Sequence, residues 1–322
     1  MRALRVHELG DPEAVLKLEE VEEPVAGEGE VLVEVEAASL NFFDILLCQG
    51  KYQVRPKLPF SPGGEVAGRV AGTDRRVVGT PSPTGGFAER VVLRESDLFD
   101  LPDALSAEKA AAMHITYGTA HVALHRRAAL RAGETVLVHA GAGGVGSAAI
   151  QLARAAGARV FATAGGPEKA AVCRDLGAEE VFDYRKTDLK EIVSAVKELT
   201  DGRGADVVFD PVGGDVFDAS RRAVGFEGRL LVVGFAGGRI AEAPTNHALV
   251  KNYSIVGVHW GLYRELAPEL LHETHRELMR LYEAGEIDPL IHSVVPFEKV
   301  PEALAKLGSR ATYGKLLTRP AG

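Results

Sequence analysis

The sequence predicts an α/β protein that combines a β-rich domain with a doubly wound domain built on a parallel sheet of six strands. Three observations predict this fold. The chain has 322 residues, which is enough for two domains. Short strands and turns fill its first third, whereas apolar strands alternate with amphipathic helices from about residue 119. A glycine-rich turn follows the first of these later strands. We therefore predict one domain over residues 1–118, completed by 260–322, and a second over 119–259.

The first half of the chain reads as strands separated by Gly- and Pro-containing turns. The stretch SLNFFDILLCQG, residues 39–50, predicts a short helix that Gly50 ends. The tail after residue 290 again reads as strand, short helix and strand, so we expect it to return and pack on the first domain. The strands expected in the first half cover residues 3–9, 15–21, 30–38, 64–72, 75–79 and 87–93.

The second half alternates near-continuous apolar strands with helices, a pattern typical of a parallel sheet covered on both faces. A longer amphipathic helix over residues 267–285 follows the last of these strands. Strands are expected over residues 135–140, 159–164, 179–184, 205–210, 229–236 and 254–260. Helices are expected over residues 147–157, 167–177, 188–200 and 215–224.

Composition excludes several classes of function. The formal net charge is −8 and the basic residues are dispersed, so the basic stripe of a nucleic-acid-binding protein is missing. No run of 18 apolar residues predicts a membrane span, and the N-terminus lacks the apolar core of a secretory signal. Without an export signal, Cys48 and Cys173 are expected to be reduced thiols in a cytoplasmic protein, although a disulfide between them is the alternative.

The glycine-rich turn, AGAGGVG, stands between a predicted strand and a predicted helix, which is the context of a dinucleotide-binding turn. One glycine permits the tight turn, another lets the backbone approach a pyrophosphate, and the last allows close packing of helix on strand. The helix N-terminus then offers N–H groups and a partial positive charge to phosphates. A tight turn that binds nothing is the alternative, but the strand, helix and second strand favour a cofactor. The expected binding residues are Gly141, Gly143, Gly144, Val145 and Gly146.

The strand after this turn lacks the acid that commonly holds the ribose 2′-hydroxyl of NAD. That position falls at about Gly165, and Lys169 follows in the first turn of the next helix. Tyr184 follows the third strand, which should neighbour the second, so Lys169 and Tyr184 can converge on a 2′-phosphate. A solvated lysine and a capping tyrosine are the alternative, but a lysine in a first helical turn opposes the helix dipole. The predicted cofactor is NADPH.

Landmarks along essentially the whole chain resemble the medium-chain dehydrogenase/reductase superfamily. They include SLNFFD, PFSPGGEVAG, GGFAERVV, LVHAGAGGVGSAAIQLA and GADVVFDPVGG, in this order. The resemblance implies a GroES-like β-rich catalytic domain and a Rossmann cofactor domain. It also implies a homodimer formed by pairing the last strands of two cofactor domains.

Zinc-dependent members of this superfamily carry a cysteine near Asn41 and a histidine where this chain has Gly64. Neither replacement can serve as the thiolate or the imidazole ligand, and two cysteines cannot build a four-cysteine site. His121 and His125 are spaced i, i+4 on a predicted helix but lack a third partner, so we expect no metal. The chain therefore resembles the zinc-free quinone oxidoreductase branch, which includes zeta-crystallin.

Without zinc, no strong Lewis acid polarises a carbonyl, so a hydride acceptor must already be electron-poor. The resemblance implies hydride transfer from NADPH to a small-molecule acceptor, either a quinone or a similarly activated conjugated carbonyl. Reduction of the C=C bond of enones or enoyl thioesters is the alternative reaction. A cofactor-binding structural or RNA-binding role, as in crystallin-like relatives, is an alternative of another class.

The resemblance also implies residues around the cofactor and the acceptor. Asn41 would reach the nicotinamide end, and Tyr52 would donate a hydrogen bond to the acceptor oxygen, so both are candidate catalytic residues. A helix cap for Asn41 and loop packing for Tyr52 are the alternatives. Further cofactor contacts are expected at Thr119, Phe235, Ala236, His259 and Arg310.

Overall fold

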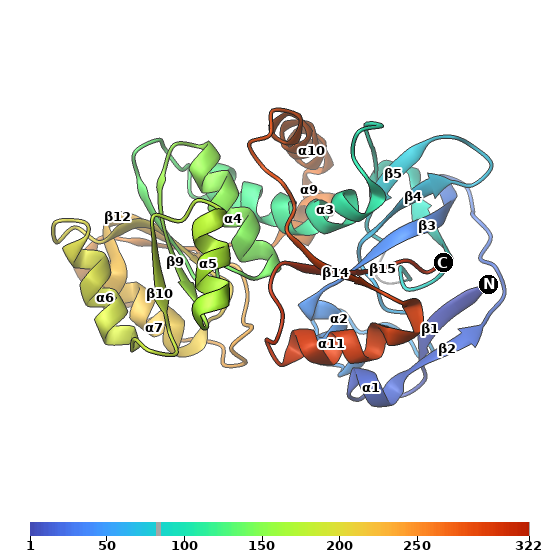
Figure 1. Cartoon of the computed structure of the whole chain (residues 1–322), viewed down its shortest axis with the longest axis horizontal. Helices are drawn as coiled ribbons and strands as arrows, with labels where there is room; N and C mark the ends of the chain where they lie inside the picture. Colours follow the sequence, from blue (N-terminus) through green and yellow to red (C-terminus); the bar gives the residue numbers. More distant parts are fainter. Residues whose placement is uncertain (82–84, 322) are drawn as a thin grey trace. The chain divides into compact units, whose positions relative to one another are not determined.

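The computed structural model describes residues 1–81 and 85–321, and the chain forms two compact units (Figure 1). Unit 1 comprises Met1–Ile115 and Pro289–Gly322, and unit 2 comprises Thr116–Asp288. The predicted α/β class is confirmed: unit 1 is rich in strands, and unit 2 holds a six-stranded sheet whose neighbouring strands are parallel.

Unit 1 is built on a seven-stranded sheet in the order β14-β15-β3-β4-β5-β7, with β6 also paired to β3, and on the hairpin β1-β2. The tail returns to this unit as predicted, because β15 pairs antiparallel with β3 and places Leu316 opposite Leu40. The strands are β1 (Arg2–Val6), β2 (Leu16–Glu20), β3 (Glu30–Leu40), β4 (Val66–Val70), β5 (Arg76–Gly79), β6 (Arg90–Arg94), β7 (Leu98–Asp100), β14 (Ile291–Val295) and β15 (Lys315–Thr318).

Strand β3 carries the chain into the interior of unit 1. Val33 and Val35 are buried while Glu34 and Glu36 are partly exposed, which is the alternation of a strand with one buried face. From Ala37 onward every residue of β3 is buried. Helix α2 (Phe42–Cys48) starts directly after it, and α11 (Val300–Gly308) packs against α2 and α1 (Pro12–Val15) (Figure 1). A polar residue at the end of β3 therefore enters a dry environment.

Unit 2 has the strand order β10-β9-β8-β11-β12-β13, which is the doubly wound order of a dinucleotide-binding domain. Figure 1 shows helices lying along this sheet. Its strands are β8 (Thr135–Val138), β9 (Arg159–Ala164), β10 (Glu180–Asp183), β11 (Ala205–Asp210), β12 (Val224–Val232) and β13 (Ser254–Gly257). Its crossover helices are α4 (Gly144–Ala155), α5 (Pro167–Asp175), α6 (Leu189–Glu198), α7 (Gly214–Ala223) and α8 (Thr245–Lys251).

The boundary between the units differs from the predicted one. Helices α9 (Trp260–Leu266) and α10 (Pro268–Glu283) lie in unit 2, although the sequence predicts that residues 260–322 complete the other domain. Hydrogen bonds from α4 also join the end of this segment to unit 2: Gln151 donates to the carbonyl of Asp288 at 3.0 Å, and Arg154 donates to that of Glu286 at 2.6 Å. Only from Pro289 does the tail join unit 1.

The helix expected around His121 and His125 begins at Ala107: α3 (Ala107–His121) continues into a π-helical turn, η2 (Val122–Arg127). Some short elements were not expected from the sequence, among them α8, which has no buried residue. Single 3₁₀ turns are η1 (Glu95–Asp97) and η3 (Phe297–Lys299). Cys48 and Cys173 are free and buried. Within the described residues, none of the helices combines the length and apolar character that a membrane crossing requires.

Candidate functional site

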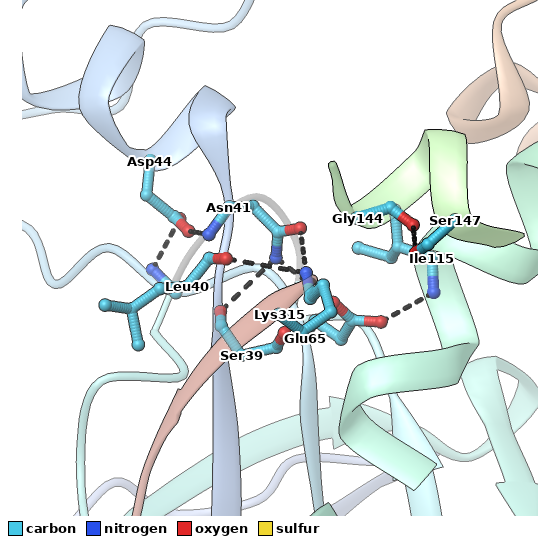
Figure 2. Close-up of polar contacts among 10 residues, drawn as sticks. Ser39, Leu40, Asn41, Asp44, Glu65, Ile115, Gly144, Ser147 and Lys315 are labelled. Carbon is cyan, nitrogen blue, oxygen red and sulfur yellow. Dashed lines mark hydrogen bonds and ion pairs between the residues drawn. The ribbon is translucent and has the colours of Figure 1, made fainter. Parts of the chain in front are cut away.

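Unit 1 holds a buried polar network where β3 ends (Figure 2). The ammonium of Lys315 donates to Asn41 Oδ1 at 2.6 Å and to the carbonyl of Leu40 at 3.4 Å. It also pairs with Glu65 Oε2 at 3.3 Å, and the Lys315 and Glu65 side chains are 5% and 0% exposed. Because an unpaired charge at such a depth is very costly, each of these two charges requires the other.

Glu65 and Asn41 complete this network (Figure 2). Glu65 Oε1 accepts from the backbone N–H of Ile115 at 2.6 Å, and Oε2 accepts from Asn41 Nδ2 at 3.1 Å. Asn41 Nδ2 also donates to the carbonyl of Ser39 at 3.3 Å. Both amide hydrogens of Asn41 are therefore used, and its Oδ1 accepts from the ammonium of Lys315. A contact between Asn41 and the nicotinamide stays a prediction, and in this arrangement it would have to be made through Oδ1.

The carboxyl of Asp44, a residue that was not predicted to belong to the site, holds the start of α2. Its Oδ2 accepts from the backbone N–H of Asn41 at 2.8 Å, and its Oδ1 accepts from that of Gly63 at 3.0 Å. Burial raises the pKa of this carboxyl to about 7, against the two N–H groups and the charge of Lys315. Asn41 occupies the N-cap position of α2 in a capping box with Asp44, and its amide also contacts Ser39, Glu65 and Lys315.

Tyr52 and Arg310 lie elsewhere in unit 1. The Tyr52 ring is half-buried and packs on Phe43, with ring centroids 5.7 Å apart. Burial raises the pKa of the Tyr52 phenol, so the hydroxyl keeps its proton at neutral pH and can donate it in a hydrogen bond. Arg310 is exposed just after α11, with a left-handed φ of 59°. The catalytic role of Tyr52 and the cofactor contact of Arg310 stay predictions.

The glycine turn of unit 2 is packed tightly on its own backbone. Gly141 N–H donates to the carbonyl of Thr163, and Gly143 N–H donates to that of Ala140, each at 2.9 Å. A Cβ placed on Gly146 would lie 2.2 Å from the Ala140 carbonyl oxygen, so only glycine fits there. Gly144 and Val145 open helix α4, which leaves the first N–H groups of that helix for a ligand at the turn.

The end of β9 meets the end of β10 as the sequence predicts. The two strands are parallel neighbours, and Tyr184 N–H donates to the carbonyl of Ala164 at 3.1 Å. A Cβ on Gly165 would lie 2.5 Å from the Tyr184 hydroxyl oxygen, so a side chain at residue 165 and this tyrosine exclude each other. Lys169 is half-buried in the first turn of α5. The adjacency is confirmed, and the binding of a 2′-phosphate stays a prediction.

Asp183 was missed at this site. Its Oδ1 accepts from the backbone N–H of Gly166 at 2.8 Å and from that of Arg185 at 3.0 Å. These hydrogen bonds hold the pKa of Asp183 below its usual range. They tie the turn after β9 to the end of β10, and so help to hold the intervening Tyr184 over Gly165. The signal in the sequence was the acid of EEVFDY, which directly precedes the tyrosine.

The remaining predicted cofactor residues of unit 2 lie in three places. Phe235 and Ala236 follow β12; the Phe235 ring packs on Gly213, and Ala236 N–H donates to the carbonyl of Pro211 at 3.0 Å. His259 is exposed and precedes α9, after β13, whereas Thr119 is half-buried in the last turn of α3. All of them except Thr119 follow the carboxyl ends of parallel strands, the edge at which doubly wound sheets bind ligands.

His121 and His125 form a close pair in unit 2, with ring centroids 4.5 Å apart. Burial lowers the pKa of His121 to about 4 and also lowers that of His125, so both rings are neutral at pH 7. Across residues 1–81 and 85–321, no three His, Cys, Asp or Glu side chains come together as ligands for a metal ion.

Two family models match the chain, and similar proteins include several named quinone oxidoreductase or quinone oxidoreductase-like protein. Residues 27–103 match the family model described as alcohol dehydrogenase GroES-like domain, and residues 144–276 match the one described as zinc-binding dehydrogenase. Quinone oxidoreductase-like protein 2 of Bos taurus is 40% identical over 312 residues, which cover 94% of this chain and 88% of that protein.

Similar solved structures include quinone oxidoreductases and an enoyl reductase. The quinone oxidoreductase of Thermus thermophilus, solved alone and in complex with NADPH, is 38% identical with a TM-score of 0.87, over 99% of this chain and 100% of that one. The CurK enoyl reductase is 25% identical with a TM-score of 0.87, over 99% of this chain and 98% of that one.

The residues present do not fit the zinc that the second family model names. At residue 64, a Cβ would lie 2.6 Å from two ring atoms of Phe43, so the space that a ligand side chain would need is filled. The Asn41 Oδ1 is already bound to the ammonium of Lys315. A cation bound there would have to displace that ammonium or lie against it, which charge repulsion opposes.

We therefore expect the dialysed protein to contain no stoichiometric zinc. Incubation with a chelator is expected to leave its melting temperature and its turnover unchanged, because residues 1–81 and 85–321 offer no ligand set from which a chelator could remove a metal. Elemental analysis of the purified chain, with a zinc-dependent alcohol dehydrogenase as the positive control, makes the measurement. One zinc per chain after dialysis would contradict this expectation.

Proposed function

The chain belongs to the quinone oxidoreductase branch of the medium-chain dehydrogenase/reductase superfamily, and on this premise we propose that it transfers hydride from NADPH to quinones or similarly activated carbonyls. The observation that carries the cofactor assignment is the acid-free Gly165 beneath the Tyr184 hydroxyl, next to a glycine turn in the doubly wound sheet. The NADPH complex of the Thermus thermophilus relative supports the same cofactor.

The residues of unit 2 have separate proposed roles in holding NADPH. The turn Gly141–Gly146 and the start of α4 would bind the pyrophosphate through backbone N–H groups. Lys169 and Tyr184 would bind the 2′-phosphate, the first as a point charge and the second as a hydrogen-bond donor. Thr119, Phe235, Ala236 and His259, together with Arg310 of unit 1, are proposed as further contacts. Bound NADPH supplies the hydride, and the protein supplies orientation and exclusion of water.

The residues of unit 1 are proposed to act on the acceptor. Tyr52 keeps its phenolic proton at neutral pH and would donate a hydrogen bond to the acceptor oxygen. Asn41, held in place by Lys315 and Glu65, would help to orient the acceptor over the nicotinamide. Solvent would deliver the proton that completes the reduction. This division of roles suits an acceptor that is already electron-poor, because such an acceptor can take up the hydride without a Lewis acid.

NADPH is expected to bind at least about tenfold more tightly than NADH, because an ammonium and a hydroxyl then meet a phosphate instead of an uncharged hydroxyl. In the Lys169→Glu variant, the preference should disappear or reverse, since a carboxylate repels the 2′-phosphate and accepts from a 2′-hydroxyl. Fluorescence titrations with both cofactors measure the ratio of the dissociation constants. Equal affinity of the unmodified protein for NADPH and NADH would refute the assignment.

Tyr52→Phe is expected to lower kcat/KM on a quinone by roughly 10-fold, the scale of one lost hydrogen bond in the transition state. The ring keeps its packing on Phe43, so the melting temperature and the dissociation constant of NADPH should stay nearly the same. Steady-state kinetics with a fixed, saturating NADPH concentration make the comparison. An unchanged kcat/KM would show that Tyr52 serves only to pack the loop and does not bind the acceptor.

Turnover of a panel of quinones, enones and enoyl thioesters tests the reaction itself. The second candidate, an NADPH-dependent enoyl-thioester or enone reductase, is favoured by the likeness to the CurK enoyl reductase. Faster turnover of C=C substrates than of any quinone would select that candidate. Tight NADPH binding without turnover of any member would favour the structural or RNA-binding role, and ready oxidation of simple alcohols would contradict the proposal.

The proposal extends to a homodimer in the cytoplasm. β13 ends the sheet order of unit 2, so within the described chain its outer edge pairs with no strand. An open strand edge is a ready surface for pairing with a second copy. Light scattering of the purified protein would test the dimer.

A further inference from the structure

We propose that His139 is a positioning residue that fixes the phosphate-binding turn through a one-way chain of hydrogen bonds from the backbone of the turn to helix α7. This inference deepens the proposed function and rests on it, since the turn matters only if the chain binds NADPH. His139 directly follows β8 and precedes the turn by one residue. None of the roles proposed above uses this ring.

The imidazole of His139 lies between two hydroxyl groups deep in unit 2. Its Nδ1 is 3.1 Å from Thr163 Oγ1 in β9, and its Nε2 is 2.9 Å from Ser220 Oγ in α7. His139, Thr163 and Ser220 are 2%, 4% and 1% exposed, so water does not compete for these contacts. Each hydrogen-bonding atom must find its partner within the protein.

The direction of every bond in the chain follows from the number of hydrogens. The single hydroxyl hydrogen of Ser220 goes to the carbonyl of Val216 at 2.7 Å, so Ser220 Oγ accepts from His139 Nε2–H. A neutral imidazole that donates at Nε2 accepts at Nδ1. Thr163 therefore donates its hydroxyl hydrogen to Nδ1, and its oxygen stays free to accept.

The backbone N–H of Ala140 uses that oxygen, donating to Thr163 Oγ1 at 3.2 Å. The chain thus runs from Ala140 N–H through Thr163, His139 and Ser220 to the carbonyl of Val216. With the opposite tautomer, Thr163 Oγ1 would accept from both Ala140 N–H and His139 Nδ1–H, so its own hydrogen would lose Nδ1 as an acceptor, and the Ser220 hydrogen would have to leave Val216 to reach Nε2. Burial lowers the pKa of His139, which keeps the ring in the neutral form that this chain needs.

Ala140 needs such support because its backbone is strained. Its φ is +51°, in the left-handed region that a residue with a Cβ rarely adopts. The carbonyl of the same residue accepts from Gly143 N–H and faces Gly146, so Ala140 sets the course of the whole turn. By accepting from the Ala140 N–H, the Thr163 hydroxyl therefore also helps to fix the position of the N–H groups that would bind the pyrophosphate.

The hydrogen-bond chain from Ala140 to Val216 can be tested first in the protein without cofactor. In ¹⁵N spectra of the protein, the His139 ring should show a protonated Nε2 and an unprotonated Nδ1 at neutral pH. Hydrogen exchange of the Ala140 amide should be slow in the unmodified protein and markedly faster in Thr163→Val, which removes the hydroxyl and keeps the side-chain shape. A His139 ring protonated on Nδ1, or an Ala140 amide exchange rate that Thr163→Val leaves unchanged, would show that this hydrogen-bond chain is wrong.

Measurements of NADPH binding then test whether this hydrogen-bond chain positions the phosphate-binding turn. Thr163→Val is expected to raise the dissociation constant of NADPH by about tenfold, the scale of a lost buried hydrogen bond, whereas Thr163→Ser should bind nearly as the unmodified protein does. The matched control is Thr200→Val, because Thr200 is also buried in unit 2 and its Oγ1 accepts a backbone N–H, from Gly204 at 2.9 Å. Thr200→Val should lose similar thermal stability and bind NADPH normally.

The outcomes separate this inference from the proposed function. If Thr163→Val and Thr200→Val bind NADPH equally well, His139 does not position the turn and the inference fails. An unmodified protein that binds no NADPH would refute the proposed function and, with it, the purpose assigned to the chain. The ¹⁵N spectra and the amide exchange would then still decide whether the hydrogen-bond chain itself exists.

Discussion

Lys315→Met is expected to lower the free energy of unfolding by about 3–5 kcal/mol, the cost of leaving one partner of a buried ion pair alone. The methionine keeps the length of the apolar stem but removes the ammonium that contacts Glu65, Asn41 and the Leu40 carbonyl. Glu65 would keep its hydrogen bonds from Ile115 and Asn41, but its charge would lie unbalanced at 0% exposure. Urea unfolding followed by circular dichroism measures the loss.

Two further variants show whether burial is the cause. Lys299→Met breaks an ion pair of the same kind in unit 1, but Lys299 and Glu302 are 55% and 53% exposed, so little change is expected. Lys315→Met combined with Glu65→Gln removes both charges and should recover part of the lost stability. If Lys315→Met proves as stable as Lys299→Met, the buried pair does not hold unit 1 together as described.

The parts of the fold that the sequence predicts are those set by local periodicity and by general rules of topology. The apolar strands of unit 2 lie in the expected doubly wound order because parallel strands with helical crossovers allow few arrangements. The same rules place Tyr184 beside Gly165, since the ends of neighbouring parallel strands meet at one edge. Here a pair of residues far apart in the sequence could be predicted without any structure.

The buried network of unit 1 could not be predicted in this way. Lys315 meets Asn41 across 274 positions of the chain, and only the pairing of β15 with β3 brings them together. A lysine in the apolar stretch GKLLT was the one signal, and it does not name its partner. The contacts of α4 with the segment after α10 could not be predicted either, because side chains of α4 bind backbone carbonyls of Glu286 and Asp288. Contacts of this kind produce no periodic pattern in the sequence.

Gly146→Ala is expected to weaken NADPH binding by about 100-fold, or ~2.7 kcal/mol, which is in the upper range of overpacking costs. The added Cβ would lie 2.2 Å from the Ala140 carbonyl oxygen and 2.9 Å from both the Ala140 carbonyl carbon and the Gly141 Cα. All three are backbone atoms, which cannot rotate away as a side chain can, so either the turn opens or α4 moves. Both changes displace the N–H groups proposed to bind the pyrophosphate, whereas the sheet of unit 2 should persist.

Fluorescence titration with NADPH measures the loss of affinity in Gly146→Ala, with circular dichroism to show that the variant is folded. Gly27→Ala serves as the control, because its Cβ would meet only the far end of the Glu30 side chain, at 3.3 Å. If the two variants bind NADPH with the same affinity, this turn is not where the phosphates lie.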